Sequence, residues 1–66
     1  MSSVGEQFPQ EQKRVRELLT QYRAIGTAGA FGALMIEQVL QRADRAAMGG
    51  DPVEILRAYN ELKGCE

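Results

Sequence analysis

The sequence predicts an all-α fold: a three-helix bundle with a long central helix, which homodimerisation would complete. Apolar residues recur at intervals of three and four through most of the chain, which is the period of a helix. Glycines and prolines end this pattern at defined points, so helices are expected over residues 9–25, 28–48 and 51–63. The linkers between them are short, and short linkers favour antiparallel neighbours in a compact bundle.

The first helix is expected to follow a flexible tail. Residues 1–7 are small and polar without a periodic pattern, so we assign residues 1–8 to the tail and residues 9–66 to a single domain. Pro9 would lie in the first helical turn, where proline is tolerated, and Gly26 would end the helix with a left-handed cap. The apolar stripe between them contains Val15, Leu18, Leu19, Tyr22 and Ile25, and Phe8 would extend it if the helix began earlier.

The second helix is expected over residues 28–48, with Thr27 as its N-cap and Gly49 and Gly50 ending it. Alternatively, residues 26–30 form a loop and the helix begins near Ala30. One broad apolar face gathers Gly29, Gly32, Ile36, Val39, Leu40, Ala43, Ala46 and Ala47. The opposite face gathers Glu37, Gln41, Asp44 and Arg45.

The first half of this helix breaks that division, because Phe31 and Leu34 point towards the polar side. A helix that is apolar nearly all round must be enclosed by neighbours. Gly29 and Gly32 each cost roughly 1 kcal/mol relative to alanine inside a helix, so they need a compensating role. Without side chains, they allow another helix to approach closely. Their spacing does not match a phosphate-binding loop, and no lysine or serine follows them.

The third helix has clear signals at both ends. Asp51 is placed as N-cap, Pro52 at the first helical position, and Glu54 where a capping box needs a carboxylate. Gly64 ends the helix, and Lys63 suits the negative end of the helix dipole. The apolar side contains Ile55, Leu56, Tyr59 and Leu62.

The size and composition of the chain restrict the class of function. A chain of 66 residues buries a small core, and such domains are often supplemented by disulfides, metals or oligomerisation. Cys65 is the only cysteine and there is no histidine, so we expect no intrachain disulfide, no metal site, no cofactor and no enzyme activity. Self-association is therefore the remaining way to supplement the small core.

The distribution of charge and hydropathy predicts a soluble, cytoplasmic protein. The first ten residues lack the basic start and apolar run of a signal peptide, and a lone cysteine is typical of a reducing compartment. The longest uncharged run, residues 24–36, is too short to span a bilayer. No small-molecule substrate is expected.

Nucleic-acid binding is the alternative function. The net charge of −1 provides no long-range attraction, so a local patch would be needed. A helix-turn-helix over residues 42–61 would open its recognition helix with Asp51 and Glu54, which suit capping better than contact with DNA. The candidate contacts are therefore on the first helix: Lys13, Arg14, Arg16 and Arg23.

Protein–protein contact is the leading hypothesis, with the chain itself or another protein as partner. If Phe31 and Leu34 project from a bundle of three helices, they form an apolar patch that a monomer would normally avoid. The other possibility is that the first helix covers them and leaves no patch. The candidate interface contains Gly29, Phe31, Gly32, Leu34 and Met35.

The pattern from "ELLTQYRAIGTAGAFGA" to "ILRAYNELKGC" resembles short helical proteins of bacteriophage and prophage genomes to which no function is assigned. The resemblance covers residues 11–66. It implies a small accessory protein that binds a host or phage protein, and inhibitors of host defence belong to this class. It assigns no role to any individual residue.

Overall fold

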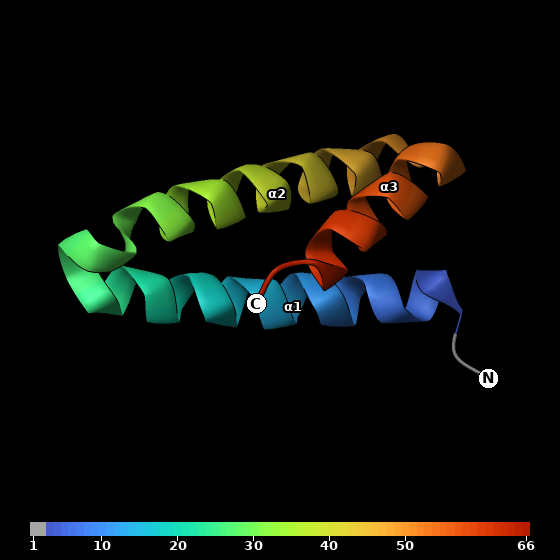
Figure 1. Ribbon diagram of the computed structural model, residues 1–66. Coiled ribbons are helices and arrows are strands. Elements are labelled where there is room, and N and C mark those ends of the chain that lie inside the picture. The colour runs from blue at the N-terminus through green and yellow to red at the C-terminus, as the bar shows by residue number, and fades with distance from the viewer. Residues whose placement is uncertain (1–2) are drawn as a thin grey trace.

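The computed structural model describes residues 3–66, which form three α-helices packed against one another (Figure 1). The helices are α1 (Val4–Ile25), α2 (Ala30–Gly49) and α3 (Pro52–Lys63), and a short 3-10 helix, η1 (Gly26–Gly29), connects α1 to α2. No strand occurs in this part of the chain. The prediction of an all-α fold is confirmed.

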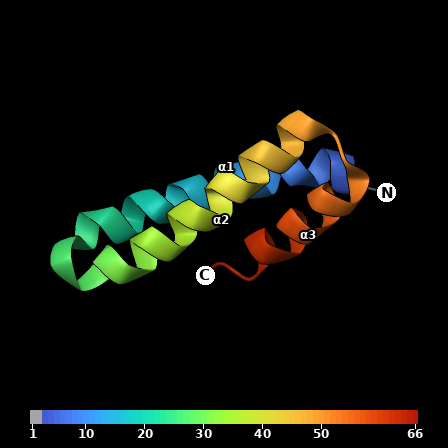
Figure 2. The ribbon, with the colours of Figure 1, turned by 90° about the horizontal axis from the view of Figure 1, so that it is seen from above.

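The two long helices form an antiparallel hairpin, and α3 packs against one half of it (Figures 1 and 2). With 12 residues, α3 is about 18 Å long, whereas the 20 residues of α2 extend about 30 Å. Because α3 starts at the open end of the hairpin and runs back along it, the half next to η1 has no third helix beside it. This half contains the uncharged run, residues 24–36.

The start of α1 differs from the prediction. The helix begins at Val4, so the predicted tail over residues 1–8 is wrong from that point onward, and residues 1–2 lie outside the described part of the chain. Ser3 caps the helix by accepting a hydrogen bond from the backbone N–H of Glu6 at 3.3 Å. Pro9 lies inside the helix instead of in its first turn. The burial of Phe8 offsets the backbone hydrogen bond that the proline removes. With its 22 residues, α1 is also longer than the central helix.

The core runs between the three helices and is made of aliphatic residues and one aromatic ring. Its buried members are Phe8, Val15, Leu19, Ala33, Ile36, Leu40, Ala43, Ala58 and Leu62. Ile25, Ala47 and Leu56 were predicted to face the core and are exposed. Leu56 lies about 100° around the helix from Ile55, which packs against the core, so its side chain points outwards. Ile25 ends α1 at the tip of the hairpin, beyond the contact between the long helices.

The helix ends follow the sequence signals in part. Gly50, with a φ of +72°, has the left-handed conformation expected at the end of α2. Gly26 ends α1 with a φ of +84° and a ψ of −139°, so the left-handed cap predicted there is wrong, although this conformation also favours glycine. The Asp51 carboxylate accepts a hydrogen bond from the backbone N–H of Val53 at 3.0 Å and caps α3. The Glu54 carboxylate pairs with Arg57 instead of completing a capping box.

The N-terminal boundary of α2 also shifts. Thr27 lies in η1 and does not cap α2, which begins at Ala30. The alternative prediction, with a loop before the second helix, is therefore closer to the structure than a helix that begins at residue 28. Residues 26–29 form a 3-10 turn rather than an irregular loop.

Candidate protein-interaction surface

The hairpin is tightly packed where α2 begins, because two glycines lie against Tyr22 of α1. A Cβ atom at Gly29 would lie 2.3 Å from the carbonyl oxygen of Tyr22, and one at Gly32 would lie 2.5 Å from Cε2 of its ring. Neither separation is possible for a real side chain. The close approach predicted for these glycines is therefore present, and it occurs within the chain.

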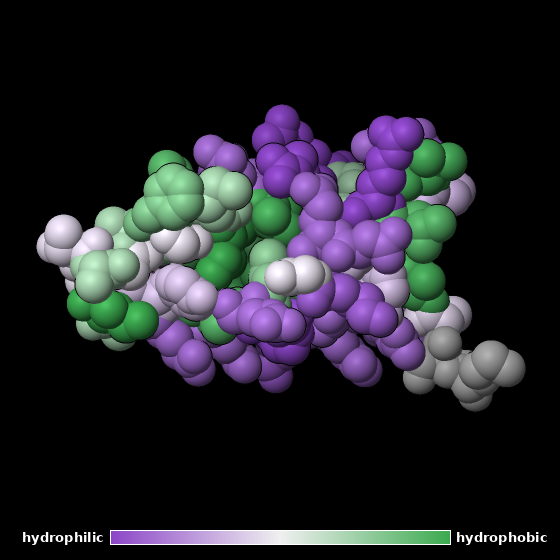
Figure 3. Space-filling model, viewed as in Figure 1, coloured by the Kyte–Doolittle hydropathy of each residue, from purple (hydrophilic) through white to green (hydrophobic). Residues whose placement is uncertain are grey.

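Three large apolar side chains project into solvent from the same half of α2, beside and opposite the face that carries the glycines. Phe31, Leu34 and Met35 are 76%, 52% and 49% exposed, and we call them the apolar edge. Helix α1 does not cover them. In Figure 3, green and white atoms form much of the surface at this end of the molecule, purple atoms predominate in its middle, and green atoms appear again at the opposite end. The five predicted interface residues thus divide into two glycines that face α1 and three side chains that face solvent.

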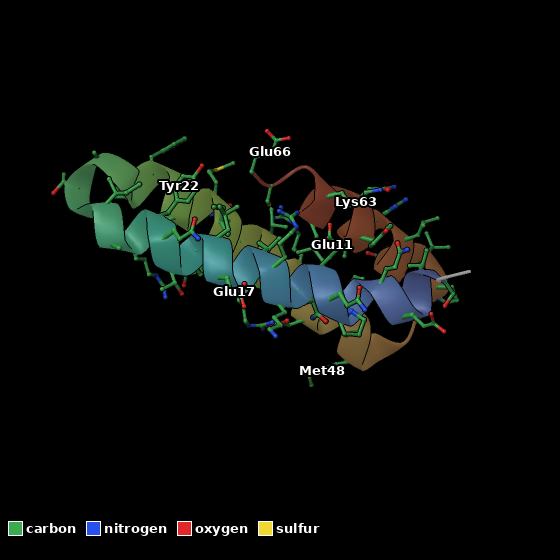
Figure 4. All side chains as sticks on the ribbon, turned by 90° about the horizontal axis from the view of Figure 1, so that it is seen from below. Glu11, Glu17, Tyr22, Met48, Lys63 and Glu66 are labelled. Carbon is green, nitrogen blue, oxygen red and sulfur yellow. The ribbon has the colours of Figure 1, made fainter. Side chains whose placement is uncertain are left out.

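A shallow groove lies beside the apolar edge, at the C-terminal end of α3. Tyr22, Gly32, Ile36, Val39 and Cys65 line it together with Met35, which belongs to the edge as well. The rest of its lining comes from Arg42, Asn60, Glu61, Gly64 and Glu66. The Tyr22 hydroxyl donates a hydrogen bond of 2.6 Å to the backbone carbonyl of Glu66 at one end of the groove; Figure 4 labels both residues. Hydrophobic atoms lie between the hairpin helices on this face of the molecule (Figure 3). The groove was not predicted from the sequence, although the predicted length of the third helix indicated that part of the hairpin would be uncovered.

Other exposed apolar side chains lie far from the edge. Met48 is 88% exposed near the end of α2, and Figure 4 shows it on the opposite side of the molecule from Tyr22 and Glu66. Val53 and Leu56 are exposed on α3. These positions provide controls for any test of the apolar edge.

The basic residues of α1 do not form a free cationic patch. Arg16 pairs with Asp44 at 2.5 Å and Arg23 with Glu37 at 3.3 Å, so both contact carboxylates of α2. Arg14 pairs with Glu11 at 2.8 Å, and this hydrogen bond raises the pKa of its guanidinium. Lys13 is exposed on the surface of α1.

Arg14 also connects α1 to the end of α3. Its guanidinium donates hydrogen bonds to the backbone carbonyls of Leu62 at 2.8 Å and Cys65 at 3.1 Å. The Leu62 carbonyl also accepts a hydrogen bond from the backbone N–H of Cys65 at 3.1 Å, so Arg14 adds a second donor there and supplies one to the Cys65 carbonyl beyond the helix end. The residue therefore has a structural role in this chain.

The thiol of Cys65 is half-buried beside the groove. Burial raises its pKa, more than the nearby Arg14 guanidinium lowers it, and the thiol contacts the carbonyl oxygen of Glu61 at 3.5 Å. A thiol with a raised pKa carries little thiolate at neutral pH, so it is a weak nucleophile. This environment fits a packing role.

Three further findings bear on the class of function. Within residues 3–66, no helix combines the length and hydropathy that a membrane span requires. The same residues contain no group of three or more histidines, cysteines, aspartates or glutamates placed to hold a metal ion. Comparison of the chain with protein-family models, curated proteins and solved structures gave no match. The function is therefore argued from the apolar edge and the groove.

Proposed function

We propose that this chain is a non-enzymatic protein–protein interaction module that self-associates through the apolar edge of α2. The observation that carries the proposal is the exposure of Phe31, Leu34 and Met35 side by side, next to a groove that is also lined by apolar side chains. Contiguous apolar surface of this kind is typical of protein–protein contacts. Among the described residues, seven large apolar side chains are exposed, and these three are neighbours on one half of α2.

The exposed fractions indicate the strength of such an interaction. Complete burial of an exposed side chain of this size contributes about 1.5–3 kcal/mol, so the three partly exposed side chains of one copy contribute about 3–5 kcal/mol. Two copies in symmetrical contact would gain about 6–10 kcal/mol, and association itself costs about 4–15 kcal/mol. Even the largest gain set against the smallest cost leaves about 6 kcal/mol, so we expect weak self-association, no tighter than roughly 40 μM.

A protein of another kind is a further partner for the same surface. The resemblance to phage and prophage proteins favours an accessory protein that acts on a host or phage protein, and the apolar edge would be its contact surface. Affinity capture from the native host with the unaltered chain and with Phe31→Glu would test this. A partner lost with Phe31→Glu is the expected result, and one retained by both chains would bind elsewhere.

Nucleic-acid binding has less support, because Arg14, Arg16 and Arg23 contact carboxylates or backbone carbonyls of their own chain. Binding through them would require these ion pairs to break. We expect no shift of duplex DNA or RNA even at low salt, where electrostatic binding is strongest.

Sedimentation velocity over a range of concentrations tests self-association directly. The unaltered chain is expected to sediment faster as its concentration rises into the high micromolar range. Phe31→Glu and Leu34→Glu should remain monomeric, because each places a charge in the proposed interface. Met48→Glu is the matched control, since Met48 is exposed but lies far from the edge. An unaltered chain that stays monomeric, or edge variants that associate like the control, would contradict the proposal.

A further inference from the structure

We propose that the second copy packs antiparallel along α2 with a two-fold axis near Met35, so that Phe31 of each copy enters the groove of the other. This inference rests on the proposed self-association and specifies its geometry. The occupant of the groove is therefore a second copy of this chain.

The positions of the apolar residues around α2 indicate this arrangement. At about 100° per residue, Leu34, Phe31, Met35 and Val39 follow one another around the helix in steps of about 40–60°. They form one continuous surface that begins at the exposed edge and ends in the groove. Phe31 lies four residues before Met35, and Val39 lies four residues after it. A two-fold axis at Met35 therefore places Phe31 of one copy opposite Val39 of the other.

The charges around this surface permit contact between two identical copies. No charged residue occurs from Ala24 to Ile36. The next charged side chain, Glu37, pairs with Arg23 of α1. Arg42 lies beside the groove and donates two hydrogen bonds to the Glu61 carboxylate, which raise the pKa of its guanidinium. The Arg42–Glu61 pair and Glu66 line the groove itself, so Phe31 of a second copy would lie beside these groups, while no charged residue lies at the two-fold axis near Met35.

The area of the apolar edge explains why the groove must take part. Phe31, Leu34 and Met35 expose roughly 300 Å² together, or roughly 600 Å² for two copies. Stable interfaces bury at least about 1,200 Å² in total. Contact between the edges alone falls short of this area. Insertion of each aromatic ring into the opposite groove adds Tyr22, Val39 and Cys65 to the buried surface.

The reactivity of Cys65 towards a thiol reagent tests the arrangement in the unaltered chain. Because Phe31 of the partner would cover the groove, the reaction of Cys65 should slow several-fold as the concentration rises through the range in which sedimentation shows association. The same measurement on Phe31→Glu should show no dependence on concentration. Should the unaltered chain associate while its Cys65 reacts at a constant rate, the arrangement is wrong and self-association stands. A chain that does not associate would overturn both proposals.

Cross-linking provides a second measurement. With Cys65→Ala as background, Met35→Cys places a thiol at the proposed two-fold axis, and mild oxidation should produce a covalent dimer. Met48→Cys in the same background is the control and should produce much less dimer. Phe31→Cys in that background should also cross-link poorly, because the two copies of residue 31 would be about 12 Å apart along α2, beyond the reach of a disulfide. Efficient cross-linking at residue 31 and not at residue 35 would overturn the antiparallel register.

Discussion

Replacement of Gly29 by alanine should destabilise the fold, although alanine is the better helix former. Alanine gains at most about 1 kcal/mol over glycine in a helical segment. Against this gain, the new Cβ atom would lie 2.3 Å from the carbonyl oxygen of Tyr22 and 3.2 Å from Cβ of Ile25. The oxygen belongs to the backbone of α1 and cannot move without displacing that helix.

The size of the effect follows from these two opposing terms. Overpacking of a close contact costs about 1–3 kcal/mol, and a clash with backbone lies towards the upper end of that range. The net loss for Gly29→Ala should therefore be about 1–2 kcal/mol. In a domain of this size, each kcal/mol lowers the melting temperature by about 4–8 °C.

Urea unfolding followed by far-UV circular dichroism, at a concentration low enough to keep the chain monomeric, measures this loss. Gly49→Ala is the matched control, because no atom lies within 4 Å of a Cβ placed there. That variant should be unchanged or more stable by about 0.5–1 kcal/mol. If Gly29→Ala unfolds at the same urea concentration as the unaltered chain or at a higher one, the hairpin is not held by this close contact.

Other predictions concern the last helix and its surroundings. Asp51→Ala should lower the free energy of unfolding by about 1 kcal/mol by removing the N-cap, and Asp51→Asn should restore most of it in the same urea experiment. Arg14→Met should cost about 1 kcal/mol, because the carbonyls of Leu62 and Cys65 lose a donor, and should increase hydrogen exchange at the end of α3. The pKa of the Cys65 thiol is raised in the folded chain, so its contribution to the free energy of unfolding is fully present below the ordinary thiol pKa of about 8.5 and is lost as the pH rises above that value. Between neutral and alkaline pH, the free energy of unfolding of the Cys65→Ala chain should therefore fall less than that of the unaltered chain.

The sequence was sufficient to predict the helices because their signals are local. Asp51 caps α3 as its position indicates, and Gly50 ends α2 in the left-handed conformation. The start of α1 was predicted five residues too late because Pro9 suggested a first turn, whereas Ser3 and Glu6 have the spacing of a capping box further upstream. The burial of Phe8 depends on packing against the other helices, which no local pattern contains.

The candidate site was predicted only in part for a related reason. Whether Phe31 and Leu34 are covered depends on how far α3 extends along the hairpin, and hence on tertiary structure. The predicted helix over residues 51–63 was already too short to cover a helix of 20 residues. A comparison of the two lengths would therefore have indicated that part of the second helix stays uncovered. The roles of the arginines in α1 could not be predicted, because their partners Asp44, Glu37 and Leu62 are distant in sequence.

The tip of the hairpin also shows how a two-helix segment can remain folded while it leaves one face free. Tyr22 is the central residue: its backbone lies against Gly29, its ring against Gly32, and its hydroxyl donates to the carbonyl of Glu66. These contacts use only the side of α2 that faces α1 and the C-terminal residues. Because the glycines bring the helices close on that side, the apolar edge on the other side is not needed for internal packing. The arrangement that stabilises the hairpin is therefore the same one that leaves Phe31, Leu34 and Met35 available for a partner.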